Sequence, residues 1–427
     1  MGSFTGALRN LRRDPARRNF FANLMDGTLY AFGMSLVSLQ TVMPVFVKEI
    51  GGGNVAVGLI PVVWVFGFNF PQILVAGYAQ RETRKKALLL KTAMGQRIPW
   101  LLLAVAAYVL FEDLGSGPSL ALFFVLLGLA AVGGSINLPV WFDLIARLTP
   151  VQRRGRLFGS RTVLGAVLGL LGGAVVTLVL DTVPGTRGYA LLLMLCFLAM
   201  MLSYVFLVSL REGPQDVRDP GRRQRPPARA LPGLLRSNHN YRNFLIADAL
   251  QISASMGAAF YTVHALEKFS LPPSTVGAFT VIMMAGSIVS SLVFGMLADR
   301  FGHRVSLVAA SAATLVACAG ALTAQGIVAY GIVFFCASVA VALPMVSRLP
   351  FLAELSSAEE RPSLVALANM VTSPFILWGV VAGWLADAWG YDVVFWLGGV
   401  HATASLAWYL AKVREPRAAA DARVSAG

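Results

Sequence analysis

Charged side chains stand inside long apolar runs at four places in the chain, Asp26, Arg97, Asp248 and Arg348. A charge at such a position is costly and is by default a candidate for function. A buried carboxylate favours its protonated form, so Asp26 or Asp248 could bind and release a proton or hold a solute. The alternative for each is a structural pair inside its own helix bundle. For Arg97 we favour that alternative, a pair with Asp26 or hydrogen bonds to Gln96 and carbonyl groups.

Uncharged polar side chains in the same apolar runs supply further points that a solute could contact. The candidates are Tyr30, Asn137, Gln251, His264 and Asn369. A polar side chain in a membrane helix is more often an interhelical hydrogen bond than a ligand contact.

A second concentration of charge lies in a short loop between two apolar runs, within "VFGMLADRFGHRVSL" at residues 293–307. The loop carries Asp299, Arg300 and Arg304. Gly295 allows close helix packing and Gly302 a tight turn. The corresponding stretch of the first half, "LVAGYAQRETRKKALLL" at residues 74–90, keeps the first glycine and the basic end.

Acidic residues at the ends of later apolar runs are natural partners for these basic loops. We predict that Arg84 and Lys85 pair with Asp143, and that Arg300 and Arg304 pair with Glu354. The alternative is that the loop charges only determine topology and helix ends. A single exposed pair contributes about 0–1 kcal/mol, so a latch would need several charges acting together.

The elements that hold these residues are apolar segments, because 57% of the chain is hydrophobic and only 13% is charged. Soluble domains carry about 25% charged residues. Twelve segments are each long enough to cross a ~30 Å hydrocarbon core as a helix. They cover approximately residues 20–46, 56–79, 87–110, 119–146, 157–180, 188–210, 242–266, 274–297, 305–324, 327–354, 363–386 and 392–412. The first is too long for a cleaved signal peptide, so we expect it in the mature protein.

The net charge of +14 is distributed unevenly between the two sides of the predicted membrane. Only Lys48, Arg187 and Lys268 fall on one side, which leaves 32 of the 35 Lys and Arg residues for the side that holds both termini. This positive-inside bias predicts cytoplasmic termini and explains the basic charge without nucleic acid. The three cysteines show no CxxC spacing and the four histidines no metal motif, so neither a metal nor a cofactor is expected.

The segments form two similar groups of six, separated by the polar stretch 211–241 with seven Arg and five Pro. "RRNFFANLMDG" (17–27) matches "YRNFLIADALQ" (241–251), and "LPVWFDL" (138–144) matches "LPFLAEL" (349–355). We therefore predict two pseudo-symmetric bundles at 20–210 and 242–412. A basic segment at 1–19, a linker at 211–241 and a tail at 413–427 would be cytoplasmic. Duplicated bundles are usual in secondary transporters.

"GMLADRFGHR" resembles the loop signature of the major facilitator superfamily, roughly G-x-L-A-D-R-x-G-R-R. The resemblance extends over about residues 18–412 and implies an all-α membrane fold whose helices 1, 4, 7 and 10 line a cavity. It also implies that the loop clusters latch the cytoplasmic gate. The first-half copy departs from the pattern, with Arg81 at the aspartate position and Arg84 at the second glycine, so the two gates should be unequal.

The leading hypothesis is a secondary active transporter that moves a small organic solute by alternating access, coupled to protons. We favour export of an amphipathic compound over nutrient uptake, because few charges line the helices and aromatic residues are plentiful. A lipid flippase and a non-transporting membrane sensor are alternatives. No nucleotide-binding GxxxxGK[ST] occurs and no nucleophile cluster suggests an enzyme. We expect a monomer in a bacterial inner membrane.

Overall fold

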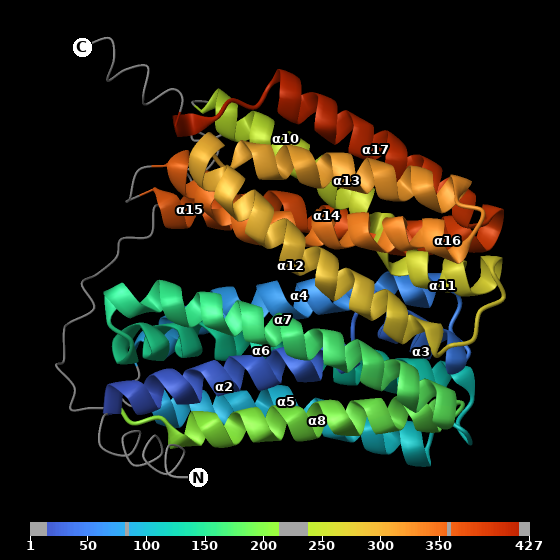
Figure 1. Ribbon diagram of the computed structural model, residues 1–427, viewed down its shortest axis with the longest axis horizontal. Helices are drawn as coiled ribbons and strands as arrows, with labels where there is room; N and C mark the ends of the chain where they lie inside the picture. The colour runs from blue at the N-terminus through green and yellow to red at the C-terminus, as the bar shows by residue number, and fades with distance from the viewer. Residues whose placement is uncertain (1–14, 82–84, 213–237, 357–359, 418–427) are drawn as a thin grey trace. The chain divides into compact units, whose positions relative to one another are not determined.

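The computed structural model describes residues 15–81, 85–212, 238–356 and 360–417, and every regular element within these ranges is a helix (Figure 1). A helix satisfies its backbone N–H and C=O groups internally, as is required in a hydrocarbon core that offers no hydrogen-bond partners. The predicted linker lies largely outside the described residues, as do Arg84 and the ends of the chain.

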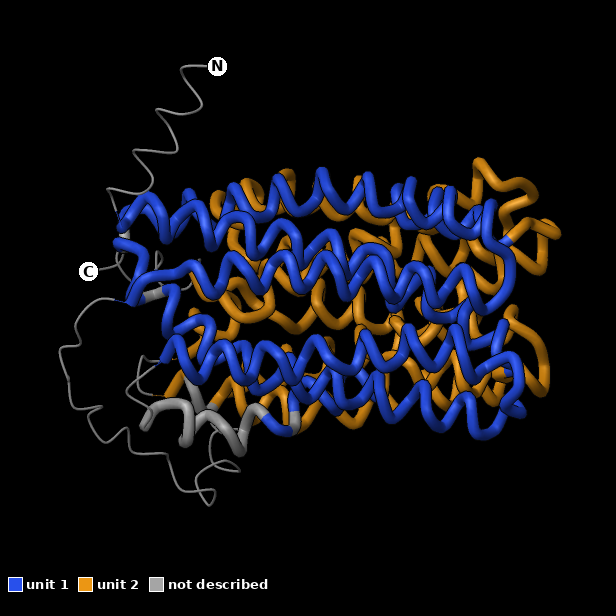
Figure 2. The backbone as a smooth tube through the Cα atoms, turned by 90° about the horizontal axis from the view of Figure 1, so that it is seen from below, with its two compact units in different colours: residues 1–51, 63–221, 273–281 blue, residues 52–62, 222–272, 282–427 orange. Residues whose placement is uncertain are grey.

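The described residues divide into two compact units (Figure 2). Unit 1 takes residues 1–51, 63–221 and 273–281, and unit 2 takes residues 52–62, 222–272 and 282–427. They follow the predicted halves except at two helix ends, because the start of α4 belongs to unit 2 and the start of α12 to unit 1.

Unit 1 contains the first group of helices. They are α2 (Pro15–Leu36), α3 (Val42–Glu49), most of α4 (Asn54–Arg81), α5 (Lys85–Val109), α6 (Ser116–Leu148), α7 (Val151–Thr182) and α8 (Thr186–Ser209). Within the unit α2 packs against α7 and α8, and α5 packs against α6 and α8. The helix that carries Asp26 is therefore in contact with two others.

Unit 2 contains the second group. Its helices are α10 (His239–Ala254), η2 (Ser255–Ala259), α11 (Phe260–Lys268), most of α12 (Thr275–Phe301), α13 (Arg304–Thr323), α14 (Ile327–Glu354), α15 (Arg361–Thr372), η3 (Ser373–Leu377), α16 (Trp378–Trp389) and α17 (Tyr391–Ala411). Here α13 packs against α14 and α17, and α10 packs against α17 and α15. The packing of α13 against α14 and α17 parallels that of α5 against α6 and α8 in unit 1.

Three predicted spans are interrupted helices. Residues 20–46 are α2 and α3, residues 242–266 are α10, η2 and α11, and residues 363–386 are α15, η3 and α16. The last interruption contains Pro374, which lacks the N–H that a continuous helix needs. In the loop motif at residues 293–307, α12 ends at Phe301 and the next residue, Gly302, has a φ of 87°, a value that glycine adopts without strain.

Large apolar side chains cover the outer faces of many helices, among them Leu178, Val205, Met296, Ile332 and Val400. A soluble monomer rarely exposes so much apolar surface. Within the described residues nine helices are long and apolar enough to cross a membrane, and a shorter apolar helix covers Asn54–Asn69. The chain is therefore a multi-pass membrane protein by length and composition.

Candidate functional site

The first candidate site is a cluster of buried charges around Asp26 in unit 1. The Asp26 side chain is only 6% exposed, and its carboxylate lies 4.0 Å from Nη2 of Arg97 and 3.7 Å from Nη1 of Arg161. The hydroxyl of Ser203 donates to Oδ1 of Asp26 over 2.7 Å. Because α2 packs against α7 and α8, residues from both helices reach the same carboxylate.

Arg97 is held entirely by groups of its own unit, which is the structural alternative that the sequence favoured. Its Nε donates to the carbonyl of Met200 at 2.8 Å, Nη1 to that of Ala93 at 2.9 Å, and Nη2 to Oγ of Ser203 at 3.0 Å. The side chain is 1% exposed. Every nitrogen of the guanidinium thus has an acceptor, and the hydroxyl of Ser203 links Arg97 to Asp26.

Arg161 on α7 belongs to this cluster and was missed by the sequence analysis. Its Nη1 donates to Oδ1 of Asn23, and its Cζ lies 4.4 Å from the centroid of the Trp141 ring, a cation–π contact. A side chain at Gly27 would collide with the guanidinium, so the glycine makes room for it. The sequence carries one signal: Arg161 lies beyond the basic cluster at 153–156 and inside an apolar run.

Unit 2 contains a second acid–base pair, between α10 and α14. Asp248 on α10 accepts a hydrogen bond from Nε of Arg348 over 2.8 Å. The same guanidinium donates from Nη1 to Oδ1 of Asn369 at 2.8 Å and from Nη2 to Oγ1 of Thr372 at 3.2 Å. Three sequence candidates, Asp248, Arg348 and Asn369, therefore form one group, and its charges balance one to one.

The other polar candidates make hydrogen bonds within their own units. Tyr30 OH accepts from Nε2 of Gln96 over 2.7 Å, and Asn137 accepts from Thr92 over 3.0 Å. Each is an interhelical contact of the kind that the alternative interpretation described.

Two further candidates lie in unit 2. Nε2 of Gln251 donates to Oγ1 of Thr314 over 2.8 Å. His264 Nδ1 lies 2.8 Å from the hydroxyl of Tyr330, and its ring lies 5.0 Å from that of Phe395. The surrounding rings make His264 part of an aromatic core.

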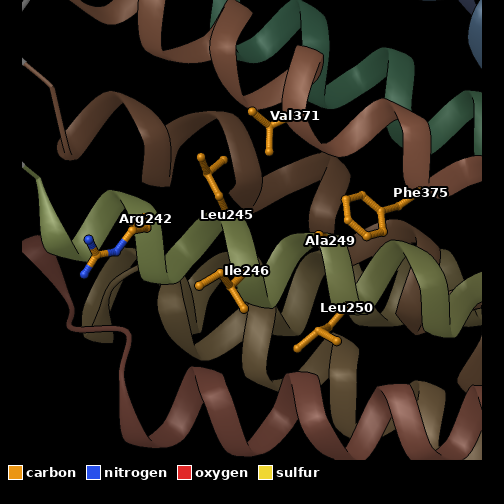
Figure 3. Close-up of a pocket in the computed structure, with 7 residues that line it drawn as sticks. All are labelled: Arg242, Leu245, Ile246, Ala249, Leu250, Val371 and Phe375. Carbon is orange, nitrogen blue, oxygen red and sulfur yellow. The ribbon is translucent and has the colours of Figure 1, made fainter. Parts of the chain in front are cut away.

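An open apolar pocket lies along α10 of unit 2 (Figure 3). It has a volume of about 380 Å³ and is lined by Arg242, Leu245, Ile246, Ala249, Leu250, Val371 and Phe375. Arg242 is the only charged residue of this lining, and its guanidinium lies at one end of the row of apolar side chains. The pocket therefore offers an apolar wall with a cationic group beside it.

The first-half loop cluster contains one of the predicted pairs. Nζ of Lys85 lies 3.1 Å from Oδ2 of Asp143. Asp143 also pairs with Arg147, one helical turn away, over 3.0 Å. Arg84, the other predicted partner, lies outside the described residues.

The second-half loop cluster differs from its prediction, because Glu354 pairs neither with Arg300 nor with Arg304. Its Oε1 accepts from Nε of Arg417 at 2.7 Å, forms an ion pair with Nη2 of the same residue at 2.6 Å, and lies 3.8 Å from Nε2 of His303. The prediction was wrong because it overlooked the chain after α17, whose Arg417 reaches the end of α14.

The remaining loop residues are placed by the same C-terminal segment. Arg304 donates from Nη2 to the carbonyls of Tyr409 and Leu410, and its backbone N–H donates to Glu415 over 2.9 Å. Burial raises the pKa of Glu415 above its usual value, and the Arg304 N–H opposes this.

Near the loop, the carbonyl of Asp299 accepts from Arg417 over 3.1 Å, and the guanidinium of Arg300 lies 5.2 Å from the Phe301 ring. Gly295 has open space where a side chain would be, so it makes no close helix contact of the kind predicted. Asp299 itself is exposed.

Comparisons with known proteins agree with this architecture. The family model described as "Major Facilitator Superfamily" matches residues 93–266 and 244–426. No curated protein matches the chain. The structure resembles that of a mutant form of the nucleoside transporter NupG, with a TM-score of 0.70 and 15% identity over 94% of this chain and 100% of that one.

It also resembles the D-xylose-proton symporter, with a TM-score of 0.65 and 15% identity over 93% and 98% of the two chains. A bacterial homologue of the human lysosomal transporter Spinster gives a TM-score of 0.67 and 13% identity over 93% and 96%. At these identities the likeness concerns the fold. With most of its length matched by the family model and its fold shared with these transporters, the chain belongs to the Major Facilitator Superfamily of secondary transporters.

Proposed function

We propose that this chain moves a small organic solute across a bacterial inner membrane by alternating access, with twelve membrane crossings and both termini in the cytoplasm. The observation that supports this best is that each unit holds a buried carboxylate paired with arginine, Asp26 on α2 and Asp248 on α10. A buried ion pair is weak evidence for stability, since well-packed apolar residues would often serve as well. Its presence among the apolar helices of each unit therefore favours function.

Proton coupling is proposed to use Asp248 before Asp26. Protonation of Asp26 would leave two nearby guanidinium groups, of Arg97 and Arg161, without their anion. Protonation of Asp248 would leave only Arg348, which keeps acceptors on Asn369 and Thr372. Protonation of Asp248 therefore breaks one ion pair and protonation of Asp26 breaks two, so the free-energy cost is lower for Asp248. Once Asp248 is neutral, Arg348 is no longer held to α10 by charge. Such a change could bias the two states of the transporter.

An amphipathic cargo is proposed, with export favoured. The apolar lining beside Arg242 suits a molecule with an apolar body and a polar or anionic group. Nutrient uptake is the contrary outcome, and transport assays distinguish the two by the direction of net movement.

The test begins with purified full-length protein and a thermal-stabilisation screen of anionic, cationic and neutral organic compounds. A stabilising compound is then followed in proteoliposomes under an imposed pH gradient. We expect gradient-driven accumulation in wild type. In Asp248→Asn we expect gradient-driven accumulation to be lost while exchange of compound at equal pH persists.

Asp181→Asn is the matched control, since this carboxylate is exposed at the end of α7. Transport that ignores the pH gradient in wild type would refute proton coupling. An unchanged gradient response in Asp248→Asn would refute the role of that residue.

A further inference from the structure

The buried cluster of unit 1 holds one positive charge more than it can balance. Arg97 and Arg161 both lie within 4.0 Å of the Asp26 carboxylate, and within the described residues neither arginine pairs with another acidic residue. The cluster of unit 2 has a single arginine for a single aspartate. Because an unbalanced charge in an apolar environment is costly, the cluster of unit 1 calls for an anion from outside the chain.

The three arginines of these clusters differ in how far their N–H groups are used. Arg97 and Arg348 each donate through all three nitrogens. Among the described residues Arg161 donates only through Nη1, to Oδ1 of Asn23, and the same nitrogen lies 3.7 Å from the Asp26 carboxylate. Its side chain is also 17% exposed, against 1% for Arg97. Arg161 is thus the guanidinium with donors still available and an approach from outside.

The side-chain amide of Asn23, which is bonded to Arg161, supplies a second donor. Its Oδ1 accepts from Arg161, which determines the orientation of the amide. Its Nδ2 is buried and has no acceptor among the described residues. A buried donor without a partner is uncommon and costs free energy until an acceptor arrives. A single anion next to Arg161 could accept from both side chains.

We propose that Arg161 and Asn23 form the binding subsite for a carboxylate group of the transported solute, an inference that rests on the proposed transport function. A carboxylate carries one negative charge, which balances the excess of the cluster, whereas a phosphate dianion would overshoot it. It also has the two acceptor oxygens that a guanidinium and an amide require. Trp141, whose ring lies beside Arg161, offers an apolar face to the part of the solute that follows the carboxylate.

The binding test uses purified full-length protein with benzoate, acetate and inorganic phosphate as probes, and benzamide as the neutral match to benzoate. Titration calorimetry and thermal unfolding are measured at constant ionic strength. We expect at least one carboxylate to bind and to raise the unfolding temperature, benzamide to have no effect, and Arg161→Gln to weaken binding about tenfold or more. Arg156→Gln, the same change at an exposed position of α7, should bind as wild type.

A probe-free arm uses Asn23→Asp, which adds a negative charge to the cluster next to Arg161. This variant should unfold at a higher temperature than wild type without any probe, and benzoate should then add nothing. Gly27→Ala, which displaces the guanidinium, should lose the response to benzoate as Arg161→Gln does. Gly159→Ala, with open space around it, is its control.

The proposal is overturned if no carboxylate stabilises the protein through Arg161, if phosphate binds more tightly than every carboxylate, or if Asn23→Asp lowers the unfolding temperature. Binding in detergent needs no transport. Arg161-dependent binding without movement in proteoliposomes would therefore contradict the transport function and leave the subsite in place.

Discussion

At the scale of single residues, the buried arginines divide by how completely their N–H groups are satisfied. Arg97 donates hydrogen bonds to two backbone carbonyls and one hydroxyl, all within unit 1. Arg161 stands beside the same carboxylate with donors to spare. Two arginines of like charge, in one cluster, therefore have different tasks.

Replacement of Arg97 by glutamine should destabilise the fold. The shorter side chain loses three hydrogen bonds to α5 and α8 and removes one partner of the buried Asp26, a change that typically costs about 3–5 kcal/mol. We expect a large fall in the unfolding temperature in detergent. Arg187→Gln is the control, because its pair with Glu112 is exposed on both sides and should contribute about 0–1 kcal/mol. Equal effects of the two substitutions would contradict the structural role of Arg97.

At the scale of helices, long-range side-chain contacts determine where several elements begin. The first N–H groups of α4 have no partner within their own helix. Asp387 on α16, within unit 2, accepts from the N–H of Asn54 over 3.2 Å and of Val55 over 3.4 Å. The hydroxyl of Tyr391 adds a bond to the Asn54 side chain over 2.9 Å. A carboxylate here also meets the positive end of the helix dipole.

Replacement of Asp387 by alanine should loosen the start of α4. Loss of a cap of this kind costs about 0.5–2 kcal/mol. Hydrogen exchange followed by mass spectrometry should show faster exchange in peptides covering residues 52–60, with little change elsewhere. Asp181→Ala, an exposed carboxylate at the opposite type of helix end, should leave that peptide unchanged. Unaltered exchange in Asp387→Ala would contradict the capping role.

At the scale of the whole molecule, the proposed alternating access requires two states, and we expect the loop motif around Asp299 to influence the balance between them because it resembles the family signature. In the described residues the motif is tied to unit 2 by its own C-terminal segment, through Arg417 and Glu415. The side chain of Asp299 is exposed at the end of α12. A latch of this kind would be unequal between the halves, as the altered first copy suggested.

Replacement of Asp299 by alanine should shift the population between the two states. Spin labels on Gln152→Cys and Ala366→Cys, in a background without the three native cysteines, report the distance between the units by pulsed EPR. We expect the distribution to change its weights while its peak positions stay the same. Asp113→Ala, an exposed carboxylate elsewhere, should not change the weights. Identical distributions in wild type and Asp299→Ala would reduce the loop to a determinant of topology.

The sequence by itself determined the class of fold, the duplication and four of the buried charges. Apolar runs of about 20 residues require helices in a membrane whatever lies around them. A charge such as Asp248 stands out in such a run without knowledge of its neighbours. The similarity of residues 17–27 to 241–251 and of residues 138–144 to 349–355 can likewise be read directly from the sequence.

Only the tertiary structure decided which charges meet. The bond from Arg161 to Asn23 spans 138 positions of the chain, and the bond from Arg348 to Asp248 spans 100. Whether an arginine has spare donors depends on carbonyls and hydroxyls that packing brings to it, so Arg161 could not be told from Arg97 in advance. The pairing of Glu354 with Arg417 was missed for the same reason. The local sequence does not distinguish between possible partners of a charged side chain, and the packing of the helices determines which partner it contacts.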